Sequence, residues 1–191
     1  MKYKLNEETK EHFGRTLHRI VCVTAFADVA AGELGGWIES ENNLDQSGNA
    51  WVSGNARVYG NARVYGNARV YGNARVSDDA RVYGDAWVSG NARVSGNARV
   101  SDDARVYGNA QVYGDAWVKK TADYIVLKNN WSSGRYFTYT LSNKMWKVGC
   151  FYGTGEALIK KAYADSELSG KCYEAAVRYV EALEKIQAEA K

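Results

Sequence analysis

Between residues 49 and 118, an alanine and, two positions later, a valine recur at every sixth residue. Side chains alternate along a strand, so each alanine shares a face with its valine and the residue between them points the opposite way. Glycine, asparagine and aspartate precede each alanine, where a tight corner requires positive φ. The pattern predicts a solenoid of twelve short strands, each stacked on its neighbours. The inward valines are Val52, Val58, Val64, Val70, Val76, Val82, Val88, Val94, Val100, Val106, Val112 and Val118.

The array resembles the hexapeptide-repeat left-handed β-helix, in which an aliphatic residue is followed four positions later by a small one. Here Ala56 follows Val52 at that spacing, and the pattern continues to Ala116 after Val112. The resemblance implies a mainly β protein with three hexads in each triangular coil, and therefore about four coils over residues 49–120. The left hand comes from the resemblance alone, because general rules of chain connection favour right-handed crossovers.

Three strands in each coil place residues eighteen apart above one another, about 4.8 Å apart. We name the three outer faces by the residues that precede the inward valines. Face one carries Trp51, Arg69, Trp87 and Arg105, face two carries Arg57, Arg75, Arg93 and Gln111, and face three carries Arg63, Arg81, Arg99 and Trp117. Tyr71 and Tyr107 flank face one, Tyr59 and Tyr113 flank face two, and Tyr65 and Tyr83 flank face three. Faces two and three are predicted to carry arginine ladders, and one corner a stack of Asn55, Asn73, Asn91 and Asn109.

Residues 1–48 are expected to form an N-terminal cap and a first, imperfect coil. The apolar segment 17–23 predicts a strand, and Gly35-Gly36-Trp37-Ile38 predicts the start of that coil. A cap is expected because the open end of a solenoid exposes a row of unpaired backbone groups.

After residue 120 the period changes, and residues 121–191 are expected to form a small α+β module of the order β-β-β-α-α. Strands are predicted at 124–127, 136–141 and 145–151, and helices at about 155–164, capped by Thr154, and 169–190. The second helix would bury one stripe, formed by Tyr173, Val177, Val180 and Leu183.

The whole chain also resembles a group of short proteins encoded by bacteriophages and prophages. The features that carry this resemblance are Gly-Gly-Trp-Ile-Glu at residues 35–39, the hexad array, and Val-Gly-Cys-Phe-Tyr-Gly at residues 148–153. It implies an accessory protein in the cytoplasm of the bacterial host, and it supplies no catalytic residues.

Composition argues against a membrane, secreted or metal-binding protein. The 191 residues include no proline, carry a net charge of +3, and contain no apolar run long enough to span a bilayer. The first residues lack the apolar core of a signal peptide. Cys22, Cys150 and Cys172 are too widely spaced for a metal site, which favours a reduced cytoplasmic protein with no metal or cofactor.

An enzyme is the less favoured class. Acyltransferases of this fold use a histidine as general base, and carbonic anhydrases of this fold hold zinc with three histidines. The two histidines here, His12 and His18, precede the array, so no coil is expected to carry one. Asp85 and Asp103 stack at one corner beside Asp102, where solvated turn residues are a better interpretation than a calcium site.

Binding is therefore the favoured class, with three alternatives open. First, the solenoid is a rigid interaction scaffold that forms a homo-oligomer, with a trimer favoured, or blocks a host protein such as a defence protein. This alternative uses three tryptophans expected to be exposed, Trp51, Trp87 and Trp117, with Arg69 and Arg105 of face one as further interface candidates. Second, the arginine ladders bind a nucleotide or nucleic acid through Arg57, Arg75, Arg93, Arg63, Arg81 and Arg99, with Tyr59, Tyr65, Tyr83 and Trp117 beside them. Third, the arginines are a solubilising coat.

Overall fold

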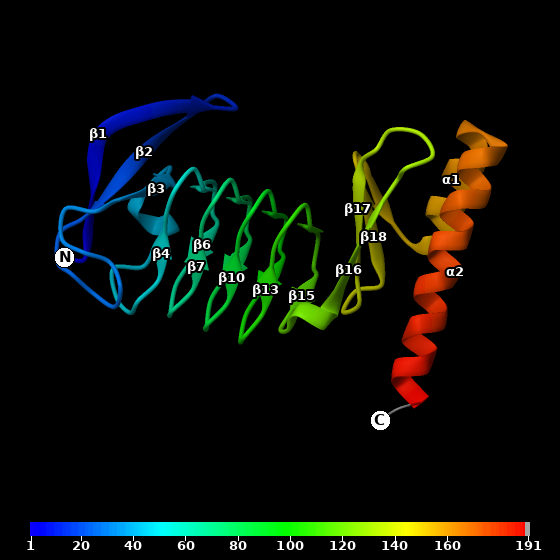
Figure 1. Ribbon diagram of the computed structural model, residues 1–191. Helices are drawn as coiled ribbons and strands as arrows, with labels where there is room; N and C mark the ends of the chain where they lie inside the picture. Colours follow the sequence, from blue (N-terminus) through cyan, green and yellow to red (C-terminus); the bar gives the residue numbers. More distant parts are fainter. Residues whose placement is uncertain (190–191) are drawn as a thin grey trace. The chain divides into compact units, whose positions relative to one another are not determined.

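The structure is a computed structural model that describes residues 1–189 (Figure 1). The chain divides into two compact units, one formed by residues 1–125 with 140–143 and the other by residues 126–139 with those from 144 onward. We describe each unit by itself.

The hexad array forms a parallel β-solenoid, as the sequence predicts. Its strands, two residues each, are β4 (Trp51–Val52), β5 (Arg57–Val58), β6 (Arg63–Val64), β7 (Arg69–Val70), β8 (Arg75–Val76), β9 (Arg81–Val82), β10 (Trp87–Val88), β11 (Arg93–Val94), β12 (Arg99–Val100), β13 (Arg105–Val106), β14 (Gln111–Val112) and β15 (Trp117–Val118). Face one is the sheet β4-β7-β10-β13, face two contains β5-β8-β11-β14, and face three is β6-β9-β12-β15. Residues eighteen apart are in register throughout, for example Arg63 with Arg81.

The interior of the solenoid is a column of alanine and valine. Every inward alanine from Ala50 to Ala116 and every inward valine from Val52 to Val118 is at most 1% exposed. Backbone hydrogen bonds join each coil to the next, as when the amide of Arg57 donates to the carbonyl of Ala74 at 3.0 Å. A narrow, fully packed core of this kind accepts one small and one branched residue for each strand.

The corners use glycine and asparagine for different reasons. Gly66 has a φ of 72°, and a Cβ there would lie 3.1 Å from the backbone nitrogen of Gly84 in the next coil. Three of the four asparagines of the predicted stack are joined by their side chains, because the Asn73 amide donates to Asn91 and the Asn91 amide donates to Asn109, each at 3.4 Å. These contacts satisfy polar groups at the corners and fix the spacing of the coils.

The N-terminal segment continues face two. Strands β1 (Tyr3–His12), β2 (Arg15–Cys22) and β3 (Leu34–Ile38) extend it to the seven-stranded sheet β1-β2-β3-β5-β8-β11-β14. Strand β3 is parallel to β5, and Leu44 bridges to Val64 just after the short 3-10 helix η1 (Glu41–Asn43). These pairings form the expected imperfect coil, which brings the solenoid to about five coils in all. Strand β1 was not predicted, because its polar sequence lacks any apolar alternation.

Lys2 and Tyr3 cover the first coil. The Lys2 ammonium donates to the carbonyl of Ala50 at 2.9 Å, and the Tyr3 hydroxyl donates to the carbonyl of Leu44 at 2.6 Å. Burial is the main reason that the pKa of Lys2 is lowered from 10.5 to about 8. These bonds satisfy carbonyl groups that would otherwise be unpaired at the open end of the stack.

The C-terminal unit is an antiparallel sheet with two helices. A short 3-10 helix, η2 (Thr121–Asp123), precedes strands β16 (Tyr124–Lys128), β17 (Tyr136–Thr140), β18 (Met145–Val148) and β19 (Phe151–Gly153), which are followed by α1 (Gly155–Asp165) and α2 (Glu167–Glu189). The Thr154 side chain caps α1, as predicted, by accepting from the amide of Ala157. In α2, Tyr173, Val177 and Val180 are buried as predicted, whereas Leu183, the fourth predicted member of the stripe, is only half-buried because it lies near the end of the helix. Residue 190, the expected end of this helix, lies outside the described residues.

The prediction of one strand over residues 145–151 is wrong. Gly149 takes a φ of 54° and makes a turn with Cys150, so that Val148 pairs with Phe151 and the segment becomes the hairpin β18–β19. The sheet therefore has four strands. Only a residue without a Cβ adopts this conformation readily, and that is the physical reason for the break.

The solenoid core generates a stability prediction. Val82→Asp buries an unpaired charge where no water or cation can reach it, and we expect it to lower the free energy of unfolding by more than about 4 kcal/mol. Val82→Ile adds one methylene and is expected to cost on the order of 1 kcal/mol. Chemical denaturation measures both variants, and equal small effects would contradict the inward placement of Val82.

Candidate interaction surfaces

Face three presents an open arginine ladder. Arg63, Arg81 and Arg99 are all exposed and in strand register, so their guanidinium groups project from neighbouring strands about 4.8 Å apart. Among residues 1–189, no carboxylate lies within ion-pair distance of any of the three. No ion pair of the described chain therefore offsets the repulsion between these cations, although Arg63 lies near enough to Asp45 to lower the pKa of that carboxyl.

Ordered aromatic side chains stand beside this ladder. The rings of Tyr65 and Tyr83 stack with centroids 5.0 Å apart and planes 2° apart. At the last coil Trp117 donates from its indole nitrogen to the Ser101 hydroxyl at 2.9 Å, and the Lys119 ammonium lies 3.8 Å from the centre of its ring. These contacts hold the aromatic groups in place before any partner arrives, which lowers the entropy cost of binding.

Face two is partly covered by the hairpin β1–β2, which extends along the solenoid (Figure 1). The Lys10 ammonium lies 3.7 Å from the centre of the Trp37 ring, and the His12 ring lies 5.2 Å from that of Tyr59. Arg57 is half-buried, and its Nε is buried without a hydrogen-bond partner. The predicted ladder of Arg57, Arg75 and Arg93 is in strand register, but the hairpin covers its first member, while Arg93 is exposed.

His12 and His18 lie in β1 and β2, so no coil strand from β4 to β15 carries a histidine. His12 is far from face two in the sequence, but the hairpin brings it against Tyr59. Burial is the first cause that lowers its pKa, and the nearby charges of Arg57 and Arg75 lower it further. The Nε2 atom of His12 is buried without a hydrogen-bond partner.

An ion pair and a backbone hydrogen bond stabilise the tip of the β1–β2 hairpin. The guanidinium of Arg15 donates to both carboxylate oxygens of Glu39, at 2.8 and 2.9 Å. Glu39 also accepts from the amide of Gly60 at 2.6 Å. Burial raises the pKa of Glu39, but these hydrogen bonds outweigh it and leave that pKa below its ordinary value. Because both partners are charged, the hydrogen bonds here are of the stronger class.

Face one carries an aromatic patch, which we define as Tyr71, Trp87 and Tyr107. Trp87 is 41% exposed, Tyr71 makes an edge contact with it at 6.1 Å, and Arg105 lies 5.0 Å from the centre of its ring. Tyr107, 56% exposed, lies in the same column of coils as Tyr71. Exposed aromatic side chains beside an arginine are typical of protein–protein contact surfaces.

Trp51 does not belong to that patch, and the expectation that it is exposed is wrong. It is 2% exposed, because Tyr3 and Phe26 of the N-terminal segment pack against its ring. Arg69, another candidate of face one, is paired with Asp28. The sequence could not reveal this, since the covering residues lie in a segment with no repeat.

The corner aspartates act as turn residues. Asp85 accepts a hydrogen bond from the Asn67 amide at 2.9 Å, and Asp102 takes the left-handed conformation that glycine takes in other coils. Within residues 1–189, no group of three or more histidine, cysteine, aspartate or glutamate side chains is arranged to hold a metal ion.

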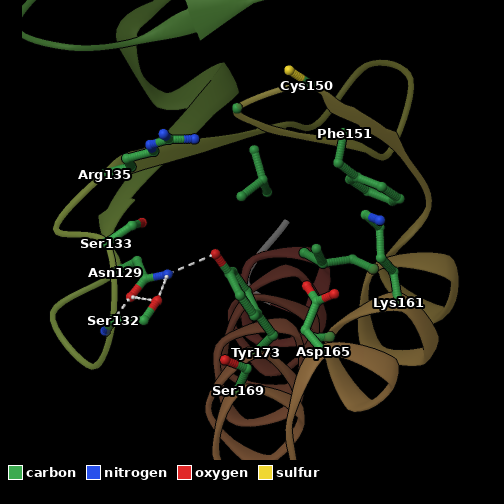
Figure 2. Close-up of a pocket in the computed structure, with 14 residues that line it drawn as sticks. Asn129, Ser132, Ser133, Arg135, Cys150, Phe151, Lys161, Asp165, Ser169 and Tyr173 are labelled. Atoms are coloured by element: carbon green, nitrogen blue, oxygen red, sulfur yellow. Dashed lines mark hydrogen bonds between the residues drawn. The ribbon is translucent and has the colours of Figure 1, made fainter.

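The C-terminal unit holds a pocket that the sequence analysis did not find (Figure 2). Its walls come from the loop after β16, the turn between β18 and β19, and both helices. The sequence gives no common signal for these segments, because the pocket depends on the unpredicted turn at Gly149 and Cys150.

Comparison with known proteins bears on the solenoid alone. The YdcK β-solenoid repeat model matches seven overlapping segments, residues 50–66, 56–72, 62–76, 74–90, 86–102, 92–108 and 98–114. The array resembles that repeat. The chain is also 39% identical over 61 residues to a protein described as "Uncharacterized acetyltransferase YdcK" from Escherichia coli (strain K12). The match covers 27% of this chain and 18% of that protein, so the chain spans less than a fifth of its relative. Across residues 1–189, the helices are too short or too polar to cross a membrane.

The contact of His12 with face two predicts that the stability of the fold depends on pH. The folded-state pKa of His12 lies below its ordinary value of 6.5, so the unfolded chain binds the proton more readily. Stability is therefore fully present above about pH 6.5 and is lost as the pH falls through the folded pKa. We expect the melting temperature to drop between about pH 7.5 and pH 5.5, and to drop less in His12→Gln. Circular dichroism measures the melting temperature of the wild type and of the variant. Equal drops in the two proteins would contradict the assignment of this pH dependence to His12.

Proposed function

We propose that this protein acts without catalysis, as a rigid β-solenoid that binds an acidic surface of a partner protein through face three and that assembles with copies of itself. The observation that carries the proposal is the row of Arg63, Arg81 and Arg99, which lie in strand register with no ion-pair partner among residues 1–189. A partner that supplied carboxylates would relieve the repulsion along this row.

The rigidity of face three supports this function. Each guanidinium has five N–H donors and pairs with a carboxylate in a planar, bidentate geometry. The strands that carry the arginines are fixed by backbone hydrogen bonds on both sides, as at Arg81, whose amide donates to Ala98 at 2.9 Å. A partner therefore meets a row of donors whose spacing is already set, and little backbone ordering is needed on binding.

The charges around face three favour a protein over a nucleic acid. Asp79 and Asp115 lie at the corner that precedes this face, and Asp85 and Asp103 lie at the corner that follows it. These carboxylates would repel the continuous phosphate chain of a nucleic acid. A protein surface has separated acidic groups and can place them between the two corners. The resemblance to phage accessory proteins favours a protein of the bacterial host, such as a defence protein, as the partner that is blocked.

A second candidate function is acyl transfer, because the relative from Escherichia coli is described as an acetyltransferase. The histidine that contacts a coil, His12, has a buried Nε2 and lies beside Arg57 and Arg75. A general base must reach the proton that it removes, and a buried nitrogen does not meet that need without movement of the hairpin. We therefore favour binding. Acetyl transfer that disappears in His12→Gln would overturn this choice.

Binding to an acidic probe tests face three. We expect a fluorescein-labelled hexaglutamate peptide to bind the wild type, and Arg63→Gln/Arg81→Gln/Arg99→Gln to weaken it by about tenfold or more, since each charged hydrogen bond contributes about 1.5–3 kcal/mol. The matched control is Arg57→Gln/Arg75→Gln/Arg93→Gln, with the same change of charge on the partly covered face.

Fluorescence anisotropy measures both affinities, and circular dichroism checks that each variant is folded. An equal loss in the two triple variants would mean that only net charge matters, which contradicts the proposal. A labelled hexathymidylate is run beside the peptide. Tighter binding of this oligonucleotide, with affinity falling steeply as salt rises, would favour the nucleic-acid alternative.

Assembly is tested by mass. We propose a homo-oligomer, with a trimer favoured, that buries the aromatic patch of face one. Light scattering at micromolar concentration is expected to give the mass of the oligomer for the wild type and of the monomer for Trp87→Glu. Trp117→Glu, a matched change on face three, is expected to keep the oligomer. A monomeric wild type would contradict assembly and leave the test of face three unaffected.

A further inference from the structure

The pocket of the C-terminal unit has a volume of about 270 Å³. It opens between the loop after β16, the β18–β19 turn and the helices α1 and α2, and side chains from all of these segments border it (Figure 2). The C-terminal unit therefore contains a concave site of its own. Concave sites with an apolar wall and a few polar groups are the usual form of a small-molecule site.

A fixed hydrogen-bond network directs one donor into the pocket. The Asn129 side chain, 3% exposed, accepts from the backbone amide of Ser132 at 3.0 Å, which fixes the orientation of its amide group. Its nitrogen then donates to the Tyr173 hydroxyl at 2.9 Å. Because this phenol oxygen is an acceptor in that bond, and no acceptor within residues 1–189 takes its own proton, that proton is available to a ligand.

Three charged side chains border the same space without partners. Arg135, Lys161 and Asp165 line the pocket, and none of them forms an ion pair with another residue of the described chain. The guanidinium of Arg135 passes close to Gly149, where a Cβ would lie 3.3 Å from its Nη1. The β18–β19 turn at Gly149 thus also makes room for the guanidinium of Arg135. Two cations, one carboxylate and a phenol donor favour an anion.

The remaining wall is apolar. Val148, Phe151 and Leu158 line the pocket, and Ala162 continues this surface between Lys161 and Asp165. An inorganic anion would leave this wall in contact with water, whereas an organic group would bury it and gain the hydrophobic contribution. The pocket therefore suits a molecule that has both an acidic group and an apolar body.

We propose that this pocket binds a small organic anion, a carboxylate or a phosphate monoester, whose acidic group lies between Arg135 and the Tyr173 hydroxyl and whose apolar body lies on Phe151 and Leu158, beside Lys161 (Figure 2). Both acidic groups accept hydrogen bonds from these donors. Cys150, an exposed residue, lies at the border of the pocket with its sulfur directed away from it (Figure 2).

Calorimetry on the full chain tests the site with four probes: phenylacetate, phenyl phosphate, benzyl alcohol and inorganic phosphate. We expect at least one of the two aromatic anions to bind with a dissociation constant below about 1 mM, and benzyl alcohol and inorganic phosphate to bind at least about tenfold more weakly. The anion that binds distinguishes a carboxylic acid from a phosphate monoester.

The variants separate this site from general charge effects. Arg135→Gln is expected to raise the dissociation constant of the anion by about tenfold, and Tyr173→Phe by about fivefold. Lys160→Gln, the matched control beside Lys161 on α1, is expected to bind as the wild type does. The melting temperature of each variant confirms folding. The proposal is overturned if neither aromatic anion binds below about 1 mM, or if Lys160→Gln weakens binding as much as Arg135→Gln.

Discussion

Stacking of one coil on the next is the constraint on which the solenoid unit depends. Each two-residue strand is too short to be stable by itself, and it gains its order from backbone hydrogen bonds to the strands eighteen residues before and after it. The inward alanine and valine fill the space between the three sheets without residual exposure. The outward positions are free of this constraint, so they are where the sequence can vary and where function is expected.

The three faces differ because of what covers them. The hairpin β1–β2 lies against Trp37, Arg57 and Tyr59 on face two, and the N-terminal segment buries Trp51 on face one. Face three keeps Arg63, Arg81 and Arg99 exposed. A row of like charges opposes stability, and the packed core is what allows the chain to keep it. Positions that break a stabilising rule without compensation are often functional, which is why we propose binding at this row.

Most of the solenoid could be predicted from its sequence because a six-residue period leaves one consistent register. The faces, the inward valines and the Asn73–Asn91–Asn109 stack all follow from that period. The burial of Trp51 and the contact of His12 with Tyr59 could not be predicted, because non-repeating segments make those contacts. The pocket beside Arg135 was missed because it depends on a single turn at Gly149.

The central claim is that the exposed row on face three is a binding site of defined position. Its most direct test is a titration of the wild-type protein with hexaglutamate, followed by the arginine Nε–Hε signals in nuclear magnetic resonance spectra. The account predicts that the signals of Arg63, Arg81 and Arg99 shift together and saturate with one dissociation constant, while the signal of Arg57 stays in place. Small, unsaturated shifts spread over all arginines, matched by the addition of sodium chloride, would contradict it.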